Sequence, residues 1–259
     1  MSGEILLTRE GEIATVTISA PERLNAMNLA MWGGLEETFR TLSADDSLRC
    51  VVLRGAGDKA FAAGADIAEF ASERANLEQA RRYGARMAQV LHGIAACRHP
   101  VLALIQGACV GGGLELICCC DLRLCDESAR FGIPVNRLGL VVAYDEMRGL
   151  VELVGKAAAL EIVLEGRVFG AGEALAKGLV NRVLPDGEVV EGAYAAARRI
   201  AEGAPLVARW HKKFINRLLR PEPLSAEEND ESFACFGTED FQIGYQSFLA
   251  KRKPVFKGR

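Results

Sequence analysis

A run of glycines followed by a glutamate is the segment of this sequence whose residue types best suit chemistry. Gly111, Gly112 and Gly113 follow a short apolar stretch, and Glu115 comes two residues later. Glycines let other groups approach the backbone closely, and N–H groups at the start of a helix stabilise a negatively charged oxygen. A nearby glutamate can move a proton, so the segment predicts an oxyanion site with an acid–base group. Close packing of two backbones, with Glu115 as a helix-capping group, is the structural alternative.

The segment from Gly55 to Asp66 is a second place where small residues gather after an apolar strand. Its first part, residues 55–60 (GAGDKA), matches the glycine pattern of dinucleotide-binding folds. That pattern has to open an amphipathic helix, whereas residues 61–66 (FAAGAD) favour a tight backbone turn. We therefore expect no nicotinamide cofactor here.

Taken together, these segments and several shorter ones resemble the signature motifs of the enoyl-CoA hydratase/isomerase (crotonase) superfamily. The likeness runs over nearly the whole chain, and the motifs follow one another in the order typical of that family. The segments that carry it are 21–26 (PERLNA), 61–70 (FAAGADIAEF), 105–116 (IQGACVGGGLEL), 120–123 (CDLR), 172–181 (GEALAKGLVN) and 248–259.

The resemblance implies an enzyme that acts on an acyl-CoA thioester. In this family two backbone N–H groups polarise the thioester carbonyl and stabilise an enolate, and the matching residues here are Ala65 and Gly112. Glu115 matches the first of two catalytic glutamates in the family's hydratases. Hydration needs one group to activate water and one to protonate the α-carbon, and two carboxylates supply both. CoA is then part of the substrate, and neither a metal nor a separate cofactor is expected.

The resemblance also implies which residues hold CoA, and they come from three parts of the chain. An arginine of an N-terminal turn reaches CoA phosphates in relatives, a second turn contacts CoA through its backbone, and the aromatic and basic C-terminus does so in some cases across a subunit boundary. The residues concerned are Arg23, Ala63, Asp66, Ile67, Ala68, Phe248, Phe256 and Lys257. Without the resemblance, Arg23 reads as a solvated surface arginine, and the C-terminus reads as a solvated basic tail or a weak nucleic-acid patch.

Val135 marks a departure from the hydratase pattern. The family's second glutamate directly follows the proline that is Pro134 here, and valine cannot transfer a proton. Residues 141–148 (VVAYDEMR) also replace the glycine-rich turn that usually comes next. Either Glu115 works alone, or another group supplies the missing acid. Tyr144, Asp145 and Glu146 lie close in sequence to the substituted segment, and Asp145 is the first candidate. An N-cap role at the start of the following helix is the structural alternative for Asp145.

Three functions are compatible with these sequence observations. The first is the addition of water to a 2-enoyl-CoA. The second is another reaction through the same enolate, namely double-bond isomerisation, thioester hydrolysis or decarboxylation; a single acid–base residue is enough for an isomerase, which fits Val135 better. The third is a CoA-binding or scaffold protein with weak catalysis, including an RNA-associated one. The net charge of −3 and the lack of an aromatic and basic patch argue against nucleic acid.

Alternating apolar residues and turn signals predict the strands and helices that position these motifs. A hairpin is expected over residues 3–19, and short buried strands end near Leu53 and Ile105, just before the two small-residue segments. Helices are expected over residues 28–42 and 73–96, where apolar residues recur at helical spacing, and another helix begins in the glycine run. Strands that alternate with helices require crossover connections, so we expect a mixed or parallel sheet.

Beyond Phe169 the sequence becomes alanine-rich and helical in pattern. The expected helices are 171–180, 188–203, 205–220 and 224–250. We therefore predict an α/β fold of two parts, a crotonase-like ββα spiral core over residues 1–200 and a helical C-terminal oligomerisation region over residues 201–259. The resemblance implies a homo-trimer or hexamer.

The composition supports a globular enzyme rather than a disordered or membrane protein. Half of the 259 residues are hydrophobic and a quarter are charged, which is enough apolar material for a large core. No run of about 18 apolar residues and no secretory signal are visible, so we expect neither a membrane partner nor export. The eight cysteines form no CxxC pair or zinc-type cluster and suit a reduced interior, which favours a cytoplasmic location.

Overall fold

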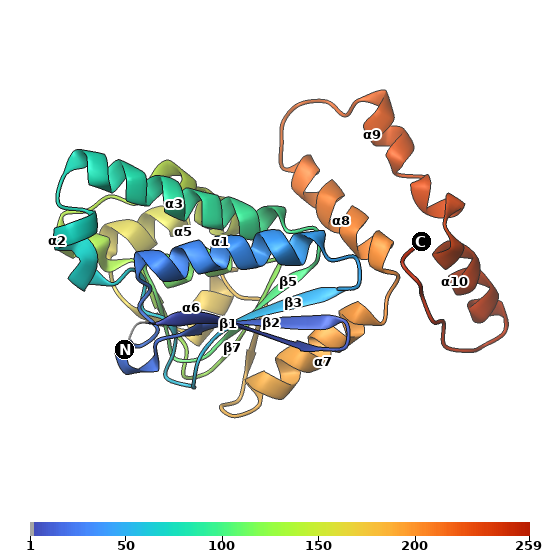
Figure 1. Cartoon of the computed structure of the whole chain (residues 1–259), viewed down its shortest axis with the longest axis horizontal. Helices are drawn as coiled ribbons and strands as arrows, with labels where there is room; N and C mark the ends of the chain where they lie inside the picture. Colours follow the sequence, from blue (N-terminus) through green and yellow to red (C-terminus); the bar gives the residue numbers. More distant parts are fainter. Residues whose placement is uncertain (1–2) are drawn as a thin grey trace.

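Six strands form the main sheet of the molecule, in the order β1-β2-β3-β5-β7-β10 (Figure 1). The computed structural model describes residues 3–259. β1 and β2 form the expected antiparallel hairpin, and every later strand pairs with its neighbour in parallel, so the predicted mixed sheet is confirmed. The bounds are β1 Glu4–Glu10, β2 Ile13–Ser19, β3 Cys50–Gly55, β5 Val101–Ile105, β7 Leu122–Asp126 and β10 Arg182–Leu184.

A second, smaller sheet has the order β4-β6-β8-β9. Its bounds are β4 Ala60–Ala62, β6 Ala108–Val110, β8 Arg130–Gly132 and β9 Phe169–Gly170. Three times in succession the chain leaves a main-sheet strand and enters a second-sheet strand: β3 leads to β4, β5 to β6, and β7 to β8. β4, β6 and β8 pair in parallel, so the segments that follow them meet at one edge of the small sheet. This repeat agrees with the predicted ββα spiral.

Helices cover both faces of the main sheet, with α1, α3 and α5 on one side and α7 on the other (Figure 1). Alternate residues of a strand point to opposite faces. Val51 and Leu53 of β3 accordingly join the core under α1 and α3, whereas Val52 packs in a second core with Val189 and Ala193 of α7. The bounds are α1 Leu29–Ala44, α3 Leu77–Ala96, α4 Gly112–Cys118, α5 Tyr144–Glu165, α6 Ala171–Ala176 and α7 Val189–Ala201.

The helix expected over residues 73–96 begins four residues later, at Leu77, so its predicted start was wrong. A short helix α2 (Phe70–Glu73) ends at Arg74, and α3 begins anew at Leu77. Asn76 causes the new start, because its side-chain oxygen accepts a hydrogen bond from the Gln79 N–H at 3.0 Å and so caps α3. The break leaves Arg74 in the short segment between two helices.

The C-terminal arm, residues 205–259, projects from the body of the molecule (Figure 1). It contains α8 (Pro205–Leu218), α9 (Ala226–Glu231), a short 3₁₀ helix η4 (Ala234–Gly237) and α10 (Glu239–Leu249). The single helix expected over 224–250 is therefore wrong, since the chain breaks after Glu231. The predicted boundary at residue 200 falls at the last turn of α7, which packs on the sheet with the core.

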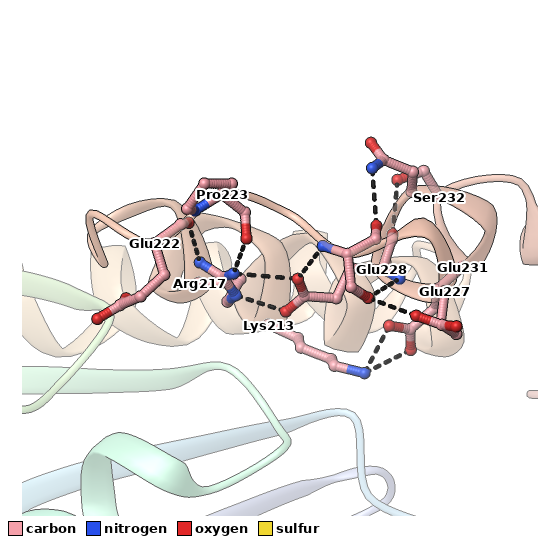
Figure 2. Close-up of polar contacts among 10 residues, drawn as sticks. Lys213, Arg217, Glu222, Pro223, Glu227, Glu228, Glu231 and Ser232 are labelled. Carbon is pink, nitrogen blue, oxygen red and sulfur yellow. Dashed lines mark hydrogen bonds and ion pairs between the residues drawn. The ribbon is translucent and has the colours of Figure 1, made fainter.

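Ion pairs hold α8 and α9 against each other in the arm (Figure 2). Arg217 of α8 donates from Nη2 to Glu228 Oε2 at 3.0 Å, and Lys213 Nζ lies 2.6 Å from Glu231 Oε1. Arg217 also donates to the carbonyls of Glu222 and Pro223 in the connecting loop. The arm thus depends on polar contacts where the core depends on apolar burial. Within residues 3–259, no helix is both long and apolar enough to cross a membrane.

Candidate active site

The segments after β4 and β6 bring two backbones into direct contact. A Cβ added to Gly64 would lie 3.0 Å from the Val110 carbonyl oxygen and 3.2 Å from the Gly112 nitrogen, and Gly64 itself has φ +93°. A Cβ on Gly113 would overlap the Ala62 carbonyl oxygen. Only glycine meets both demands, since it has no Cβ and tolerates positive φ. The close-packing reading of the glycine run is therefore correct, and it is compatible with the oxyanion reading.

Two amides at this contact have no partner within the described residues: neither the Ala65 nor the Gly112 N–H donates a hydrogen bond there. The chain around Ala65 is held firmly, because the Met27 N–H donates to Gly64 O at 2.8 Å and the Asp66 N–H donates to Met27 O at 2.8 Å. Gly112 is the first residue of α4, where helix N–H groups point outward. Two adjacent amides are therefore available to an oxygen atom of a ligand.

Glu115 lies one helical turn after Gly112 and is almost completely buried, with 4% of its surface exposed. Its Oε2 atom is buried without a hydrogen-bond partner among the described residues. Burial raises the pKa of this carboxyl well above its ordinary value, the Glu146 carboxylate raises it further, and Arg74 opposes both effects. A buried, unsatisfied carboxyl is costly to stability by about 1–3 kcal/mol, and such groups gather at functional sites.

Glu146 is the acidic residue that follows Asp145, and sequence reasoning ranked it behind Asp145. It is the third residue of α5 and is 8% exposed, and its Oε2 accepts a hydrogen bond from the Ala143 N–H at 3.1 Å. Burial raises its pKa, while the Ala143 N–H and Arg74 lower it. Helical spacing was the available signal, because Glu146 stands four residues before the fully buried Leu150 and so shares its inward face.

Asp145 lies on the outer side of the same helical turn. Its side chain is 45% exposed, with Oδ1 3.6 Å from His92 Nε2 and 3.9 Å from Arg148 Nη2. The expected N-cap role is wrong, because the N-cap residue is Ala143 and Asp145 is already inside the helix. Its role as a substitute acid stays a prediction. Val135 lies in the 3₁₀ helix η3 (Pro134–Leu138) and packs against the core.

Arg74 is a further charged residue of the site that the sequence did not single out. Its guanidinium lies 4.8 Å from the Phe70 ring centroid and 4.7 Å from that of Tyr83, and it is close enough to lower the pKa of both glutamates. Tyr83 is buried, which raises its pKa to about 12, and its hydroxyl accepts a hydrogen bond from Trp32 Nε1 at 3.0 Å. The Trp32 ring lies directly against Gly112, where an added Cβ would come within 3.1 Å. These side chains form one wall beside the amides.

The structure brings together the residues expected near CoA in the first third of the chain. Arg23 pairs with the buried Asp66 carboxylate, which also accepts a hydrogen bond from the Ala68 N–H at 3.1 Å. Asp66 thereby caps the 3₁₀ helix η2 (Ile67–Glu69), whose Ile67 side chain is 58% exposed. The Ala63 N–H donates to Leu24 O at 3.0 Å and joins this segment to the N-terminal turn.

Asn25 holds that N-terminal turn on the strands and was not predicted. It is fully buried; its Oδ1 accepts from the Ala20 N–H at 3.0 Å, and its Nδ2 donates to the carbonyls of Ala56 and Ala60. Leu24 and Asn25 both have φ near +55°, a conformation that costs non-glycine residues about 1–3 kcal/mol. The three side-chain hydrogen bonds of Asn25 hold the turn in this strained form and fix the neighbouring Arg23.

The predicted CoA contacts at the C-terminus lie elsewhere in the same chain. Phe248 lies in the last turn of α10 and is 83% exposed, Lys257 pairs with Glu239, and the Phe256 carbonyl accepts a hydrogen bond from Arg49 at 2.7 Å. Figure 1 shows α10 at the opposite end of the molecule from α2. A single chain therefore does not bring these three residues to the amides and Glu115.

The remaining expectations concern cofactors and cysteines. Residues 55–60 lead into strand β4 and not into a helix, so the context that a dinucleotide fingerprint requires is missing.

All eight cysteines are free, and burial raises the pKa of the thiols of Cys109, Cys118 and Cys120. Cys118 ends α4, and the matching segment 120–123 lies beyond that helix and leads into β7. In the described part of the chain, no group of three or more His, Cys, Asp or Glu side chains is arranged to hold a metal.

Comparison with known sequences gives matches over the full length of the chain. A family model described as enoyl-CoA hydratase/isomerase matches residues 8–259. A short-chain-enoyl-CoA hydratase of Clostridium acetobutylicum is 33% identical, and the alignment covers 98% of each chain. A crotonyl-CoA hydratase of Syntrophomonas wolfei is 34% identical, and the alignment covers 97% of each chain.

Solved structures share the fold equally completely. An enoyl-CoA hydratase/carnithine racemase from Magnetospirillum magneticum matches with a TM-score of 0.97 at 54% identity, over 98% of this chain and 96% of that one. An enoyl-CoA hydratase from Bacillus anthracis matches with a TM-score of 0.92 at 29% identity, over 99% of this chain and 100% of that one. The arrangement of strands and helices described above is thus common to these proteins.

Proposed function

Because the chain belongs to the enoyl-CoA hydratase/isomerase family, we propose that it adds water across the double bond of a 2-enoyl-CoA thioester. One observation carries the proposal: a buried glutamate without a hydrogen-bond partner at Oε2, Glu115, lies one helical turn from two adjacent free amides. Relatives named short-chain-enoyl-CoA hydratase and crotonyl-CoA hydratase support the same reaction. They do not favour isomerisation, thioester hydrolysis or decarboxylation.

The chemistry of the site follows from its donors. The thioester carbonyl oxygen accepts hydrogen bonds from the N–H groups of Ala65 and Gly112, which become stronger as negative charge moves onto that oxygen. One such donor contributes about 3 kcal/mol to the stability of an oxyanion. The α-carbon then carries enolate character, and the β-carbon is open to attack by water. Glu115 transfers a proton in this step, and burial, which raises the pKa of its carboxyl, favours the protonated form that can donate one.

The CoA moiety is held first by the surface around Arg23 and Asp66. Arg23 offers a guanidinium to the phosphates, and backbone groups of Ala63, Ile67 and Ala68 line the turn. Phe248, Phe256 and Lys257 reach CoA only if they come from a neighbouring subunit, since they lie far from this surface in their own chain. CoA is substrate, and no separate cofactor is needed for this chemistry.

Assembly into a homo-trimer is part of the proposal. The C-terminal arm exposes a set of large apolar side chains, and patches of this kind mark interfaces between proteins. Those at least 60% exposed are Ile215, Leu218, Leu219, Phe233, Phe236, Phe248, Leu249 and Val255. Light scattering is expected to give three times the mass of one chain, or six times if two trimers associate. The cytoplasmic location stays a prediction.

The test of the function is an assay with crotonyl-CoA, the substrate named for one relative. We expect the absorbance of the conjugated thioester to fall, and the product to have gained the mass of one water. A product of unchanged mass would indicate isomerisation, and loss of the acyl group or of carbon dioxide would indicate hydrolysis or decarboxylation. Any of these results in place of hydration would contradict the proposed function.

A further inference from the structure

We propose that Glu146 is the second proton-transfer group of this site and replaces the carboxylate that is absent at Val135. The proposal rests on the proposed hydration and names the residue that completes it. It differs from the assignment to Asp145, which lies one residue earlier in the sequence.

Close packing of α4 on α5 places the two glutamates on facing helix surfaces. A Cβ on Gly149 would lie 3.2 Å from both the Cβ and the carbonyl oxygen of Cys118. Cys118 comes three residues after Glu115, and Gly149 comes three residues after Glu146, so each glutamate shares a helix face with the residue at the contact. Glu115 and Glu146 are 4% and 8% exposed, and each responds to the charge of Arg74.

The hydrogen bonds of Glu146 leave one of its oxygens available. Oε2 accepts from the Ala143 N–H, as the third residue of a helix commonly does for the N-cap amide. Oε1 accepts no hydrogen bond within the described residues. A capping role alone would be met by an exposed glutamate, and it does not explain why this carboxyl is buried beside Glu115.

Two carboxyls that share a buried space do not both ionise easily, because each negative charge disfavours the other. Arg74, held between Phe70 and Tyr83, supplies one positive charge near the pair. The stable state is then one carboxylate and one carboxylic acid. Hydration needs this combination of a base and an acid, and the environment creates it from two residues of one type.

The reaction balances with this pair and one water molecule. The carboxylate accepts a proton from water while the water oxygen forms a bond to the β-carbon. The electrons of the carbon–carbon double bond move toward the carbonyl oxygen at Ala65 and Gly112. The carboxylic acid then gives its proton to the α-carbon, and the thioester carbonyl re-forms. One water has been added, and the proton of the pair has passed to the other glutamate, from which solvent exchange restores the starting state.

The test compares E146Q with E152Q, which removes an exposed carboxylate from the same helix. The amide oxygen of glutamine can still accept the Ala143 N–H, so E146Q keeps the cap. We expect E146Q to lower kcat for crotonyl-CoA hydration by about 10²–10⁴-fold with KM changed by less than about threefold. E152Q is expected to stay within about twofold of wild type. Wild-type affinity of E146Q for butyryl-CoA, a saturated analogue that cannot be hydrated, shows that the variant is folded.

Separate outcomes distinguish a failure of this assignment from a failure of the function. If the wild-type protein does not hydrate crotonyl-CoA, the proposed function fails. If wild type hydrates and E146Q does so at the wild-type rate, or if D145N loses the activity that E146Q keeps, the assignment to Glu146 is overturned. If E146Q does not bind butyryl-CoA, E146D is used instead. Its side chain is one methylene shorter, so the carboxylate is kept but lies farther from the substrate. E146D is expected to lower kcat at least about tenfold, and full activity would contradict the proposal.

Discussion

The surroundings of Glu115 and the C-terminal arm differ in the kind of chemical group that has no partner within the chain. Around Glu115, backbones touch, and the groups left unpaired are polar: two amides and a buried carboxyl oxygen. In the arm, ion pairs hold the helices together, and the groups left unpaired are large apolar side chains such as Phe236 and Phe248. The first region needs a small polar ligand, and the second needs another protein surface. On the proposed function, a single chain would carry the reacting groups but only part of the surface that holds CoA.

The largest expected effect comes from removing the acid–base group of the first region. E115Q is expected to lower kcat for crotonyl-CoA by about 10²–10⁴-fold, because the amide cannot take up or release the proton. E222Q, which removes a carboxylate from the exposed loop of the arm, is the matched control and should leave kcat within about twofold of wild type. Equal losses of kcat in both variants would mean that the effect is not specific to the carboxyl of Glu115.

A backbone substitution tests how tightly the first region is built. G113A is expected to lower the free energy of unfolding by about 2–4 kcal/mol, because its Cβ overlaps the Ala62 carbonyl oxygen. G84A on α3 is the control, since nothing lies within 4 Å of its added Cβ. It should raise that free energy by about 0.5–1 kcal/mol, because alanine favours the helix. Denaturant unfolding measures both, and a tolerated G113A would disprove the close contact.

Acid is expected to weaken the junction between the arm and the body through His99. This residue is fully buried, and its carbonyl accepts a hydrogen bond from Lys212 of α8. Burial lowers its pKa to about 4, and the charges of Arg209 and Arg98 add to the effect. The unfolded chain therefore binds a proton more readily, and stability is lost as pH falls below the unfolded pKa of about 6.5. Between pH 7 and pH 5 the loss is about 2 kcal/mol.

Replacing His99 by glutamine removes the titrating group and should flatten this part of the stability profile. H211Q on the exposed surface of α8 is the control and should leave the acid dependence unchanged. Urea unfolding at a series of pH values gives both profiles. A slope that persisted in H99Q would assign the acid sensitivity to other groups.

The smallest effect is expected within the arm itself. R217M removes the partly buried pair with Glu228 on α9 and the hydrogen bonds to the carbonyls of Glu222 and Pro223. Ion pairs near the surface contribute about 0–1 kcal/mol. Thermal unfolding at low and high salt should show a small loss that shrinks as salt screens the remaining charges. A loss above about 2 kcal/mol would mean that the two helices rely on this pair far more than its exposure suggests.

The strands, the glycine contact and the place of Glu115 in the first turn of the following helix could be predicted from the sequence, because apolar alternation and glycine runs are local signals. Sequence reasoning ranked Asp145 ahead of Glu146 for a physical reason. Alanine is a poor N-cap, so nothing in the sequence marked Ala143 as the cap of α5, and Asp145 took that role by residue type. Successive residues on a helix are turned by about 100°, so an error of two residues in its start decides which side chain faces the core. Arg74 was missed because Asn76 starts a new helix where one long helix was expected.

The repeat of strand pairs does not supply the same backbone N–H groups in each of its units. Ala65 and Gly112 follow the short strands of two successive units, and their amides meet because those strands lie side by side. The third unit ends in β8, and the residue at the offset of Gly112 is Pro134, two positions after the strand. Proline has no N–H to donate. The spiral therefore repeats its architecture three times, but at the offset of Gly112 the third unit has no N–H group to offer a ligand.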